Sequence, residues 1–357
     1  MGDGIGRRYR LTTWGESHGP GLGGVIEGCP SRLRLDIGMV QRELSRRRPG
    51  QSSLTSSRQE GDEVEFVSGL YEGMTTGTAL SFMIRNKDAH SGDYAELSRL
   101  YRPSHADYTY SQKYGVRDPR GGGRASARET VARVVGGAVA KQCLSGYGIE
   151  VMGYTSQIGE VRVSKSYTEL DLSQTELTSV RCPDAEVASA MAARIMSAKA
   201  SGDSVGGVVT CVVRGVPVGL GEPVFDKLQA LLGHACLSIP SAKGFDYGDG
   251  FGAPLYSGSA HNDAFESRGG VIRTKSNYSG GIQGGISNGE DIYFRVSFKA
   301  VPTIFKEQWT VDVSGEGVQM RGKGRHDACV VPRAVVVVEA MASMVILDLL
   351  LVQKTYS

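Results

Sequence analysis

The feature that most constrains this sequence is its last long apolar run, residues 330–352, which is long enough to cross a membrane. One proline and three charged residues interrupt the run: Pro332, Arg333, Glu339 and Asp348. Charged side chains are costly in lipid, so these interruptions favour a buried core helix over a membrane span. We therefore expect an apolar helix over residues 334–352 that closes the chain, and no membrane partner.

Composition supports a folded protein with a sizeable core. The chain has 357 residues, of which 40% are hydrophobic. Glycine accounts for 49 of them, about 14%, which is twice the usual share of roughly 7% but shows no collagen period. These values exclude fibrous and disordered classes. No stretch is rich enough in Pro, Gly or Ser to act as a linker, so we expect one domain over residues 1–357.

Charge and cysteine content limit the partners and the compartment. The 40 Lys+Arg nearly balance the 38 Asp+Glu, so net charge gives no sign of nucleic-acid binding. The six cysteines are scattered and form no Cys-x-x-Cys pair, which is typical of a reduced cytoplasm. Residues 1–8 contain no apolar segment of a secretory signal. We expect a cytoplasmic protein.

Hydrophobic periodicity predicts a mixture of strands and helices. Strands are expected at residues 9–14, 25–27, 78–84, 207–213 and 292–301. Further helices are expected at residues 36–48, 124–144 and 225–232. Residues 86–120 are polar and are predicted to form one long loop, and loops of that length are usually functional.

Two short motifs match known sites but lack the required context. Gly15-Glu16-Ser17-His18-Gly19 fits the nucleophile elbow of serine hydrolases, which needs a helix directly after the serine. Residues 19–24 fit the G-x-G-x-x-G pattern of dinucleotide-binding proteins, which also needs a helix after its last glycine. An extended Val25-Ile26 pair follows instead. A serine hydrolase at Gly15–Gly19 stays an alternative.

Three of the six histidines stand in unusual surroundings. His18 follows Ser17 in a glycine-rich turn, His105 lies within the long polar loop, and His326 is flanked by Arg325 and Asp327. Imidazole exchanges a proton near neutral pH, so these are candidate acids or bases, although each could be a loop histidine that only forms hydrogen bonds. No His-x-x-x-His spacing predicts a metal site.

Arginines form the main anion-binding signal. The segment from Arg120 through three glycines to Ser126 leads into a predicted helix, which directs backbone N–H groups and guanidinium groups at an anion. Ser126 and Glu129 also fit a capping box. Together these residues indicate a small polyanionic ligand, such as a phosphorylated one, and groups that protonate it. Spacing alone does not name the reaction.

Three separated blocks resemble the chorismate synthase family, over essentially the whole chain. They are Gly15–Gly19, then Arg102–Asp107 with Gly123–Thr130, then Gly324–Asp327, with support from Arg46–Gly50 and Gly248–Phe251. The resemblance implies an α/β fold, a β-α-β sandwich with internal pseudo-twofold symmetry, assembled as a homotetramer. It also implies a carbon–oxygen lyase of the shikimate pathway. That enzyme eliminates phosphate from 5-enolpyruvylshikimate 3-phosphate in a 1,4-anti sense to give chorismate, requiring reduced FMN without net redox change.

The resemblance also implies site residues, position by position. His18 would protonate the reduced flavin, His105 with Ser17 would keep a proton near the departing phosphate, and Asp327 would work with the flavin N5 in taking up the substrate hydrogen. Besides these four residues, the resemblance also gives Ser126 a catalytic role. The implied flavin contacts are Arg124, Ala125, Ser126, Pro240, Ser241, Gly284, Lys299, Ala300, Val301, Pro302, Thr303 and Arg325. The implied substrate-binding residues are Arg47, Arg48, Arg102, Arg128 and Arg325.

Some positions depart from the family pattern. Ser53 stands where many members have arginine, Pro240 replaces a common asparagine, residues 300–303 differ from the usual Pro-Thr-Ser-Ser, and Ala328 replaces a proline. We expect an active enzyme with altered cofactor contacts. A relative that binds flavin or anions without activity is the alternative. No nicotinamide motif is found, so we expect an external flavin reductase or another NADPH-dependent source of reduced FMN.

Overall fold

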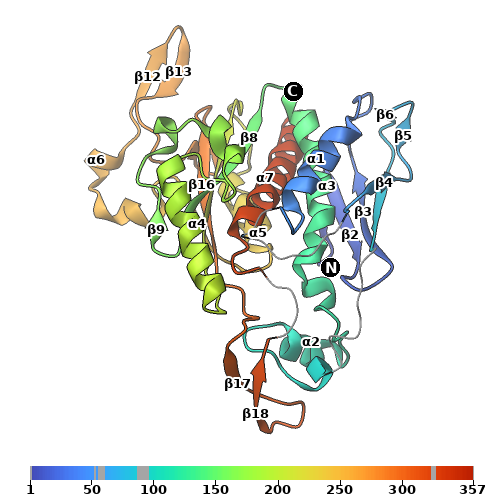
Figure 1. Cartoon of the computed structure of the whole chain (residues 1–357). Helices are drawn as coiled ribbons and strands as arrows, with labels where there is room; N and C mark the ends of the chain where they lie inside the picture. The colour runs from blue at the N-terminus through green and yellow to red at the C-terminus, as the bar shows by residue number, and fades with distance from the viewer. Residues whose placement is uncertain (1, 52–53, 55–60, 87–95, 323–326, 357) are drawn as a thin grey trace.

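The computed structural model describes residues 2–51, 54, 61–86, 96–322 and 327–356. Two five-stranded antiparallel sheets enclose a layer of helices (Figure 1). The first sheet has the order β1 (Gly4–Ile5), β2 (Arg10–Gly15), β3 (Gly21–Glu27), β7 (Leu80–Arg85), β4 (Val64–Phe66). The second has the order β11 (Ala242–Tyr247), β16 (Ile292–Phe298), β10 (Gly207–Arg214), β8 (Glu150–Ile158), β9 (Val161–Arg162). The implied β-α-β sandwich is confirmed.

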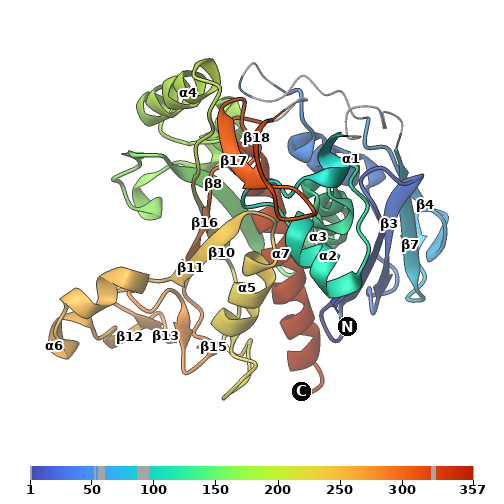
Figure 2. The same ribbon diagram turned by 90° about the horizontal axis from the view of Figure 1, so that it is seen from below.

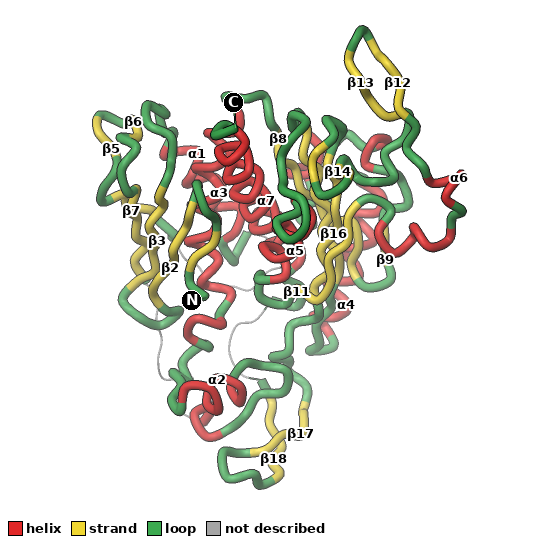
Figure 3. The backbone as a smooth tube through the Cα atoms, turned by 180° about the vertical axis from the view of Figure 1, so that it is seen from behind, coloured by secondary structure: helices red, strands yellow, loops and turns green. Residues whose placement is uncertain are grey.

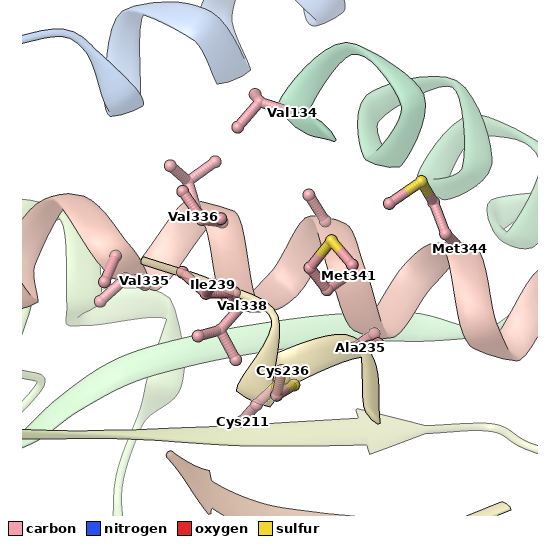
Figure 4. Packing of buried hydrophobic residues seen from close by; sticks show 14 of the residues in the cluster. Val134, Cys211, Ala235, Cys236, Ile239, Val335, Val336, Val338, Met341 and Met344 are labelled. Atoms are coloured by element: carbon pink, nitrogen blue, oxygen red, sulfur yellow. The ribbon is translucent and has the colours of Figure 1, made fainter. Parts of the chain in front are cut away.

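Four helices lie between the sheets: α1 (Ile37–Arg47), α3 (Thr130–Ser145), α5 (Leu228–Leu237) and α7 (Val331–Gln353). Small residues allow α3 and α7 to pack closely, since a Cβ atom on Gly137 would fall 2.2 Å from the Cβ of Ala340. Figure 4 shows α7 in this core, with Val336 and Met344 on the side of Val134, and Val338 near Cys236 and Cys211. One continuous hydrophobic cluster includes residues from both sheets and all four helices.

The apolar run at residues 330–352 forms α7, as predicted. By length and composition this helix could cross a membrane, but 89% of its most apolar window is buried inside the fold. Its two acidic residues have protein partners. Glu339 accepts hydrogen bonds from Arg46 and Lys141, and Asp348 accepts from the backbone N–H groups of residues 7–9. α7 is therefore a core helix.

The remaining elements lie around this sandwich. Helix α4 (Ala185–Ala200) covers the edge near β8 and β9, and α6 (Gly258–His261) lies near the projecting hairpin of β12 (Phe265–Arg268) and β13 (Val271–Thr274) (Figure 1). Two further short hairpins are β5 (Leu70–Tyr71) with β6 (Met74–Thr75), and β14 (Ile282–Gln283) with β15 (Ile286–Ser287). Six described 3₁₀ turns are Glu96–Arg99, Gly123–Ala125, Ala127–Glu129, Tyr167–Glu169, Leu172–Leu177 and Gly250–Leu255.

Helix α2 (Asp107–Tyr114) and the hairpin of β17 (Glu307–Val311) and β18 (Gly317–Arg321) lie together at one end of the sandwich (Figures 2 and 3). An isolated bridge between Leu100 and Asp312 joins the segment before α2 to this hairpin. Segments far apart in sequence therefore meet at this end, which is where the candidate site lies.

The predicted strands and the helix at residues 36–48 are confirmed, but three other predictions are wrong. The loop predicted at residues 86–120 contains α2, which ends at a left-handed Gly115; residues 87–95 lie outside the described part. The helix predicted from residue 124 begins at Thr130, because Ser126 is extended and separates two 3₁₀ turns. The helix predicted at 225–232 spans Leu228–Leu237, because Val224 is left-handed and Lys227 is extended.

Candidate active site

A cavity of about 400 Å³ lies where the turn after β2, the segment before α2, the turns before α3 and the start of α7 converge. The start of β11 and the segment after β16 complete its wall. The predicted site residues that line it are Ser17, His18, Arg102, His105, Ala125, Ser126, Arg128, Pro240, Ser241, Lys299, Val301, Pro302, Thr303 and Asp327. The structure thus brings together residues separated by more than three hundred positions.

Both predicted imidazoles pack against the same short piece of backbone. A Cβ atom on Gly121 would fall 2.5 Å from Cδ2 of His18, and one on Gly122 would fall 2.9 Å from Cε1 of His105. These glycines have φ angles of +64° and +99°, which disfavour any residue with a side chain. The ring of His18 therefore packs against Gly121 and the ring of His105 against Gly122, so the two imidazoles contact consecutive residues of the glycine run.

His105 is held through one ring nitrogen. Its Nδ1 lies 3.1 Å from Oδ1 of Asp107 and 3.1 Å from Nη2 of Arg102. Asp107 also pairs with Arg102 at 2.7 Å and with Arg117 at 3.0 Å. Burial alone would raise the pKa of Asp107, but hydrogen bonds from Arg102 and His105 lower it well below its usual value. Asp107 is therefore an ionised anchor, and Nε2 is the edge of His105 available to a ligand.

The turn that carries Ser17 and His18 is held by Asn86. The Asn86 amide donates to the backbone carbonyls of Ser17 at 3.3 Å and of Gly19 at 2.8 Å. Asn86 Oδ1 in turn accepts from Nε of Arg128 at 3.1 Å, and Nη1 of Arg128 pairs with Asp62. One buried ion pair thus connects the wall of the cavity to the turn that presents His18.

Asp327 lies in the segment just before α7 and contacts Arg333 in the first turn of that helix. The Nη1 atom of Arg333 pairs with Asp327, and its Nε donates to the backbone carbonyl of Arg47 at 2.8 Å. Arg333 therefore joins the predicted base to the C-terminal end of α1. The Arg47 side chain is only 2% exposed and forms a 3.4 Å ion pair with Asp62 below the cavity.

Five other predicted site residues that the structure describes do not line this cavity: Arg47, Arg48, Arg124, Gly284 and Ala300. Arg325, and Ser53 where the family pattern has arginine, lie outside the described residues. The Arg124 guanidinium instead donates to Thr13 Oγ1 at 2.8 Å and pairs with Asp3 at 2.8 Å, beside a neighbouring cavity of about 800 Å³. Gly284 lies in the turn between β14 and β15.

The predicted capping box is wrong in its second half. Ser126 Oγ accepts from the backbone N–H of Arg128 at 3.2 Å, so the serine does cap the turn. The Glu129 carboxylate, however, accepts from Thr13 Oγ1 at 3.0 Å and from Arg133 Nε at 2.8 Å. The Glu129 side chain does not reach back to the backbone N–H of Ser126, because Thr13 on β2 and Arg133 on α3 bind its carboxylate instead.

Sequence reasoning missed four residues of the site: Asn86, Asp107, Lys243 and Arg333. Asp107 lies within a quoted motif and could have been found from its spacing of two residues from His105. In the sequence, Arg333 stands out only as an interruption of an apolar run. No local signal marks Asn86 or Lys243, since their roles depend on contacts with distant segments.

The serine hydrolase alternative is not supported by the local geometry. Ser17 is followed by strand β3 and not by a helix, and β3 also replaces the helix that a dinucleotide fold would need. The lining includes five cationic side chains and one carboxylate: Arg102, Arg128, Lys243, Lys299, Arg333 and Asp327. Fold and cavity define an α/β protein whose cavity is lined by two histidines and an excess of cationic side chains.

Comparison with known proteins identifies the family. The chorismate synthase family model matches residues 9–351. The chain is 59% identical over 351 residues to a chorismate synthase of Parabacteroides distasonis, and 58% identical over 355 residues to one of Phocaeicola vulgatus. These alignments cover 98% and 99%, respectively, of both chains. A chorismate synthase crystal structure superposes with a TM-score of 0.79 at 32% identity, covering 97% of this chain and 93% of the other.

The chain belongs to the chorismate synthase family, and it is a carbon–oxygen lyase that acts on phosphates. The predicted family and fold class are confirmed.

Proposed function

We propose that this chain converts 5-enolpyruvylshikimate 3-phosphate to chorismate and phosphate by 1,4-anti elimination, with reduced FMN bound beside the substrate. The observation that carries the proposal is the placement of His18 and His105 against adjacent glycines in one cation-lined cavity. The substrate has a phosphate and two carboxylates, and such groups are bound by arginine and lysine through charge-assisted hydrogen bonds.

The residues of the cavity fit a flavin and a phosphorylated substrate. Ser17 Oγ is buried and has no hydrogen-bond partner among the described residues, although buried hydroxyl groups are normally paired. Gly121 and Gly122 leave space where a side chain would collide with the imidazoles. The flavin would be held by Ala125 and Ser126 on one side, and by the segments 240–241 and 299–303 on the other. When bound, reduced flavin supplies an electron-rich ring beside the substrate.

His105 and Arg102 are assigned to the departing phosphate. Asp107 fixes the His105 ring through Nδ1, so Nε2 can hold a proton toward the phosphate as negative charge develops on the leaving oxygen. Arg102 is 6% exposed, and its guanidinium lies 3.1 Å from the same ring. The buried guanidinium gives a fixed positive charge next to the leaving group.

His18, Ser17 and Asp327 are assigned to the remaining proton movements. His18 holds a proton on the flavin side of the cavity, and the Ser17 hydroxyl donates a hydrogen bond toward the substrate phosphate. Asp327 is the carboxylate positioned to take up a proton, since its partner Arg333 keeps it oriented at the cavity. Ser126 positions Arg128 through the hydrogen bond to its backbone N–H.

We extend three further family properties to this chain: a homotetramer, a cytoplasmic location and an external source of reduced flavin. Gly284 does not line the cavity of one chain, so a flavin contact from Gly284 requires another subunit. NADPH and oxidised FMN, added to the purified protein without a reductase, are expected to give no turnover. Sustained chorismate formation under those conditions would show that the chain reduces its own flavin.

An anaerobic spectral titration tests the proposed function. The protein is mixed with photoreduced FMN, and 5-enolpyruvylshikimate 3-phosphate is then added. We expect the flavin spectrum to change when the substrate arrives and to return as chorismate forms. An unchanged spectrum together with an unconsumed substrate would contradict the proposal.

A further inference from the structure

Arg181 is a buried arginine that does not itself line the cavity, in the loop between the 3₁₀ turn Leu172–Leu177 and α4. It is only 6% exposed and has a φ of +56°, which is rare for a residue with a side chain. Its N–H donates to the Thr178 carbonyl at 3.0 Å, and its carbonyl accepts from the N–H of Thr155 on β8 at 2.7 Å. The surrounding structure therefore fixes an uncommon backbone conformation, which is a frequent feature of functional positions.

The guanidinium group of Arg181 contacts three separate segments of the chain. Its Nε donates to Oε2 of Glu176 at 3.2 Å, its Nη2 donates to Oε1 of Gln51 at 2.8 Å, and its Nη1 donates to the backbone carbonyl of Pro332. Pro332 lies in the first turn of α7, next to Arg333. One buried side chain therefore joins the segment after α1, the segment before α4 and the start of α7.

Gln51 extends this contact to the end of α1. Its Nε2 donates to the backbone carbonyl of Arg46 at 2.7 Å and to the backbone carbonyl of Arg48. Arg48 is the C-cap of α1, and the next residue, Pro49, lines the cavity. The Gln51 side chain thus holds the chain against the end of the helix and fixes the segment that carries Arg48 and Pro49.

The contact with Pro332 affects Asp327 through the first turn of α7. Pro332 precedes Arg333, and the Arg333 guanidinium pairs with Asp327 at the cavity. A displacement of Pro332 would move Arg333 with it, because both residues belong to one turn of the helix. Each of the two segments that Arg181 joins therefore supplies lining residues of the cavity: Pro49 from one, and Asp327 and Arg333 from the other.

Stability alone does not account for a buried arginine at this place. Burial lowers the pKa of Arg181, since removing a guanidinium group from water is costly. Apolar residues of similar volume often replace buried ion pairs without loss of stability. The side chain of Glu176 is 46% exposed and also pairs with Arg46 at 2.7 Å, so this carboxylate does not depend on Arg181. What only an arginine provides here is the pair of directed contacts with Gln51 and Pro332.

We propose that Arg181 is a positioning residue for the reaction, which fixes the end of α1, through Gln51, relative to the start of α7, through Pro332. The inference rests on the proposed function, because it concerns the same site. The contact at α7 acts on proton uptake by Asp327 and therefore on kcat. The contact at α1 acts on the segment of Arg48, a predicted substrate-binding residue, and therefore on KM. A misplacement of about 1 Å can lower the rate on the order of a hundredfold.

Arg181→Lys tests the proposal, with Arg194→Lys on α4 as the matched control. Lysine keeps the charge beside Glu176 but cannot contact the Pro332 carbonyl and Gln51 together. We expect kcat for chorismate formation to fall about tenfold and KM for 5-enolpyruvylshikimate 3-phosphate to rise about tenfold, as for the loss of one charge-assisted hydrogen bond at each end. The pH profile of kcat should also shift, which a merely structural role would not produce. Arg194 likewise pairs with a carboxylate, at 3.0 Å, and does not line the cavity, so its variant should match the wild-type protein.

Gln51→Met separates the contact at α1 from the contact at α7. The variant loses the hydrogen bonds to the carbonyls of residues 46 and 48 and keeps the contact between Arg181 and Pro332. We expect KM to rise about tenfold with kcat nearly unchanged. In the double variant with Arg181→Lys, KM should rise no further, because residues of one hydrogen-bond network have non-additive effects. Gln51 is exposed, so this variant also serves if Arg181→Lys does not fold, and an unchanged KM would then overturn the proposal.

Each outcome of these measurements supports or refutes the positioning role. A lower kcat and a shifted pH profile in Arg181→Lys, with a non-additive change of KM in Gln51→Met, would support it. Kinetic constants and pH profiles that match those of Arg194→Lys would refute it, and additive changes of KM would refute the connection through Gln51. Absent turnover in the wild-type protein would contradict the proposed function separately.

Discussion

Asp107 anchors the imidazole of His105, with 3.1 Å between Oδ1 and Nδ1. The same carboxylate accepts hydrogen bonds from the buried Arg102 and forms an ion pair with Arg117, so it is held ionised and fixed in place. The arrangement leaves Nε2 toward the cavity. The contact with Asp107 explains why the His105 ring has a defined orientation although it lies in a polar segment.

His105→Ala is expected to reduce turnover by roughly a hundred- to ten-thousand-fold, the usual effect of removing an acid–base group. Flavin binding should persist, because the segments proposed to hold the flavin come from other parts of the chain. The measurement is kcat for chorismate formation together with an FMN titration. His234→Ala, at an exposed histidine of α5, is the control and should retain normal activity. Near-normal turnover in His105→Ala would remove the assignment.

Gly122→Ala is expected to lower kcat about tenfold or more, because strain at such a position amounts to about 1–3 kcal/mol and the ring of His105 must move. The new Cβ would lie 2.9 Å from the ring, at a φ of +99°. Gly252→Ala is the control, since a Cβ there meets nothing within 4 Å. Steady-state kinetics and melting curves of both variants provide the comparison. Equal kcat values in the two variants would show that close packing at Gly122 does not position His105.

Arg333→Lys tests whether Arg333 positions Asp327. Lysine keeps the charge but cannot reproduce the two contacts of the guanidinium, with Asp327 and with the Arg47 carbonyl. Loss of one charge-assisted contact is expected to lower kcat about tenfold, with a smaller change in KM. The pH profile of kcat should also shift, which a purely structural role would not produce. An unchanged profile and an unchanged kcat would exclude the positioning role.

Glu339→Gln tests the buried charge cluster of the core. Burial alone would raise the pKa of Glu339, but the charges of Arg46 and Lys141 lower it well below its usual value. Removing the carboxylate takes one partner from two buried cations, which keep Glu43 as their remaining shared carboxylate, so the free energy of unfolding should fall, by up to about 3–5 kcal/mol, in urea titrations. Glu160→Gln, in an exposed pair with Arg194, is the control and should leave it nearly unchanged, because exposed ion pairs contribute little.

The lowered pKa of Glu339 also predicts how the free energy of unfolding changes at acid pH. Because the folded-state pKa of Glu339 is depressed, its contribution to stability is present above the ordinary glutamate pKa of about 4.3 and is lost as the pH falls through the lower folded value. The wild-type protein should therefore lose stability below about pH 4.3 more steeply than Glu339→Gln. Parallel curves for the two proteins would contradict this linkage.

The features that could be predicted from the sequence are those marked by a long apolar run or by a short motif. The apolar run at 330–352 predicts α7, since few other structures can bury so many apolar side chains in succession. The family blocks predict which histidines share a site. Helix α2 was missed because only Asp107 of its residues is buried, so it has no clear apolar stripe.

The rest of the site could not be predicted because it depends on tertiary contacts. Lys243 lines the cavity because of the register of β11 against β16, which no local pattern specifies. Arg124 fits an anion-binding turn by sequence, yet in the fold its guanidinium pairs with Asp3, 121 positions earlier. Asn86 joins the His18 turn to Arg128 although it belongs to no recognisable motif.

The stoichiometry of a single anaerobic reaction tests the central claim most directly. Wild-type protein, reduced FMN and 5-enolpyruvylshikimate 3-phosphate are mixed, and chorismate, inorganic phosphate and oxidised flavin are quantified together. We predict equal amounts of chorismate and phosphate, with the flavin still reduced at the end. Phosphate released without chorismate, flavin oxidised in proportion to product, or no product at all would contradict the account.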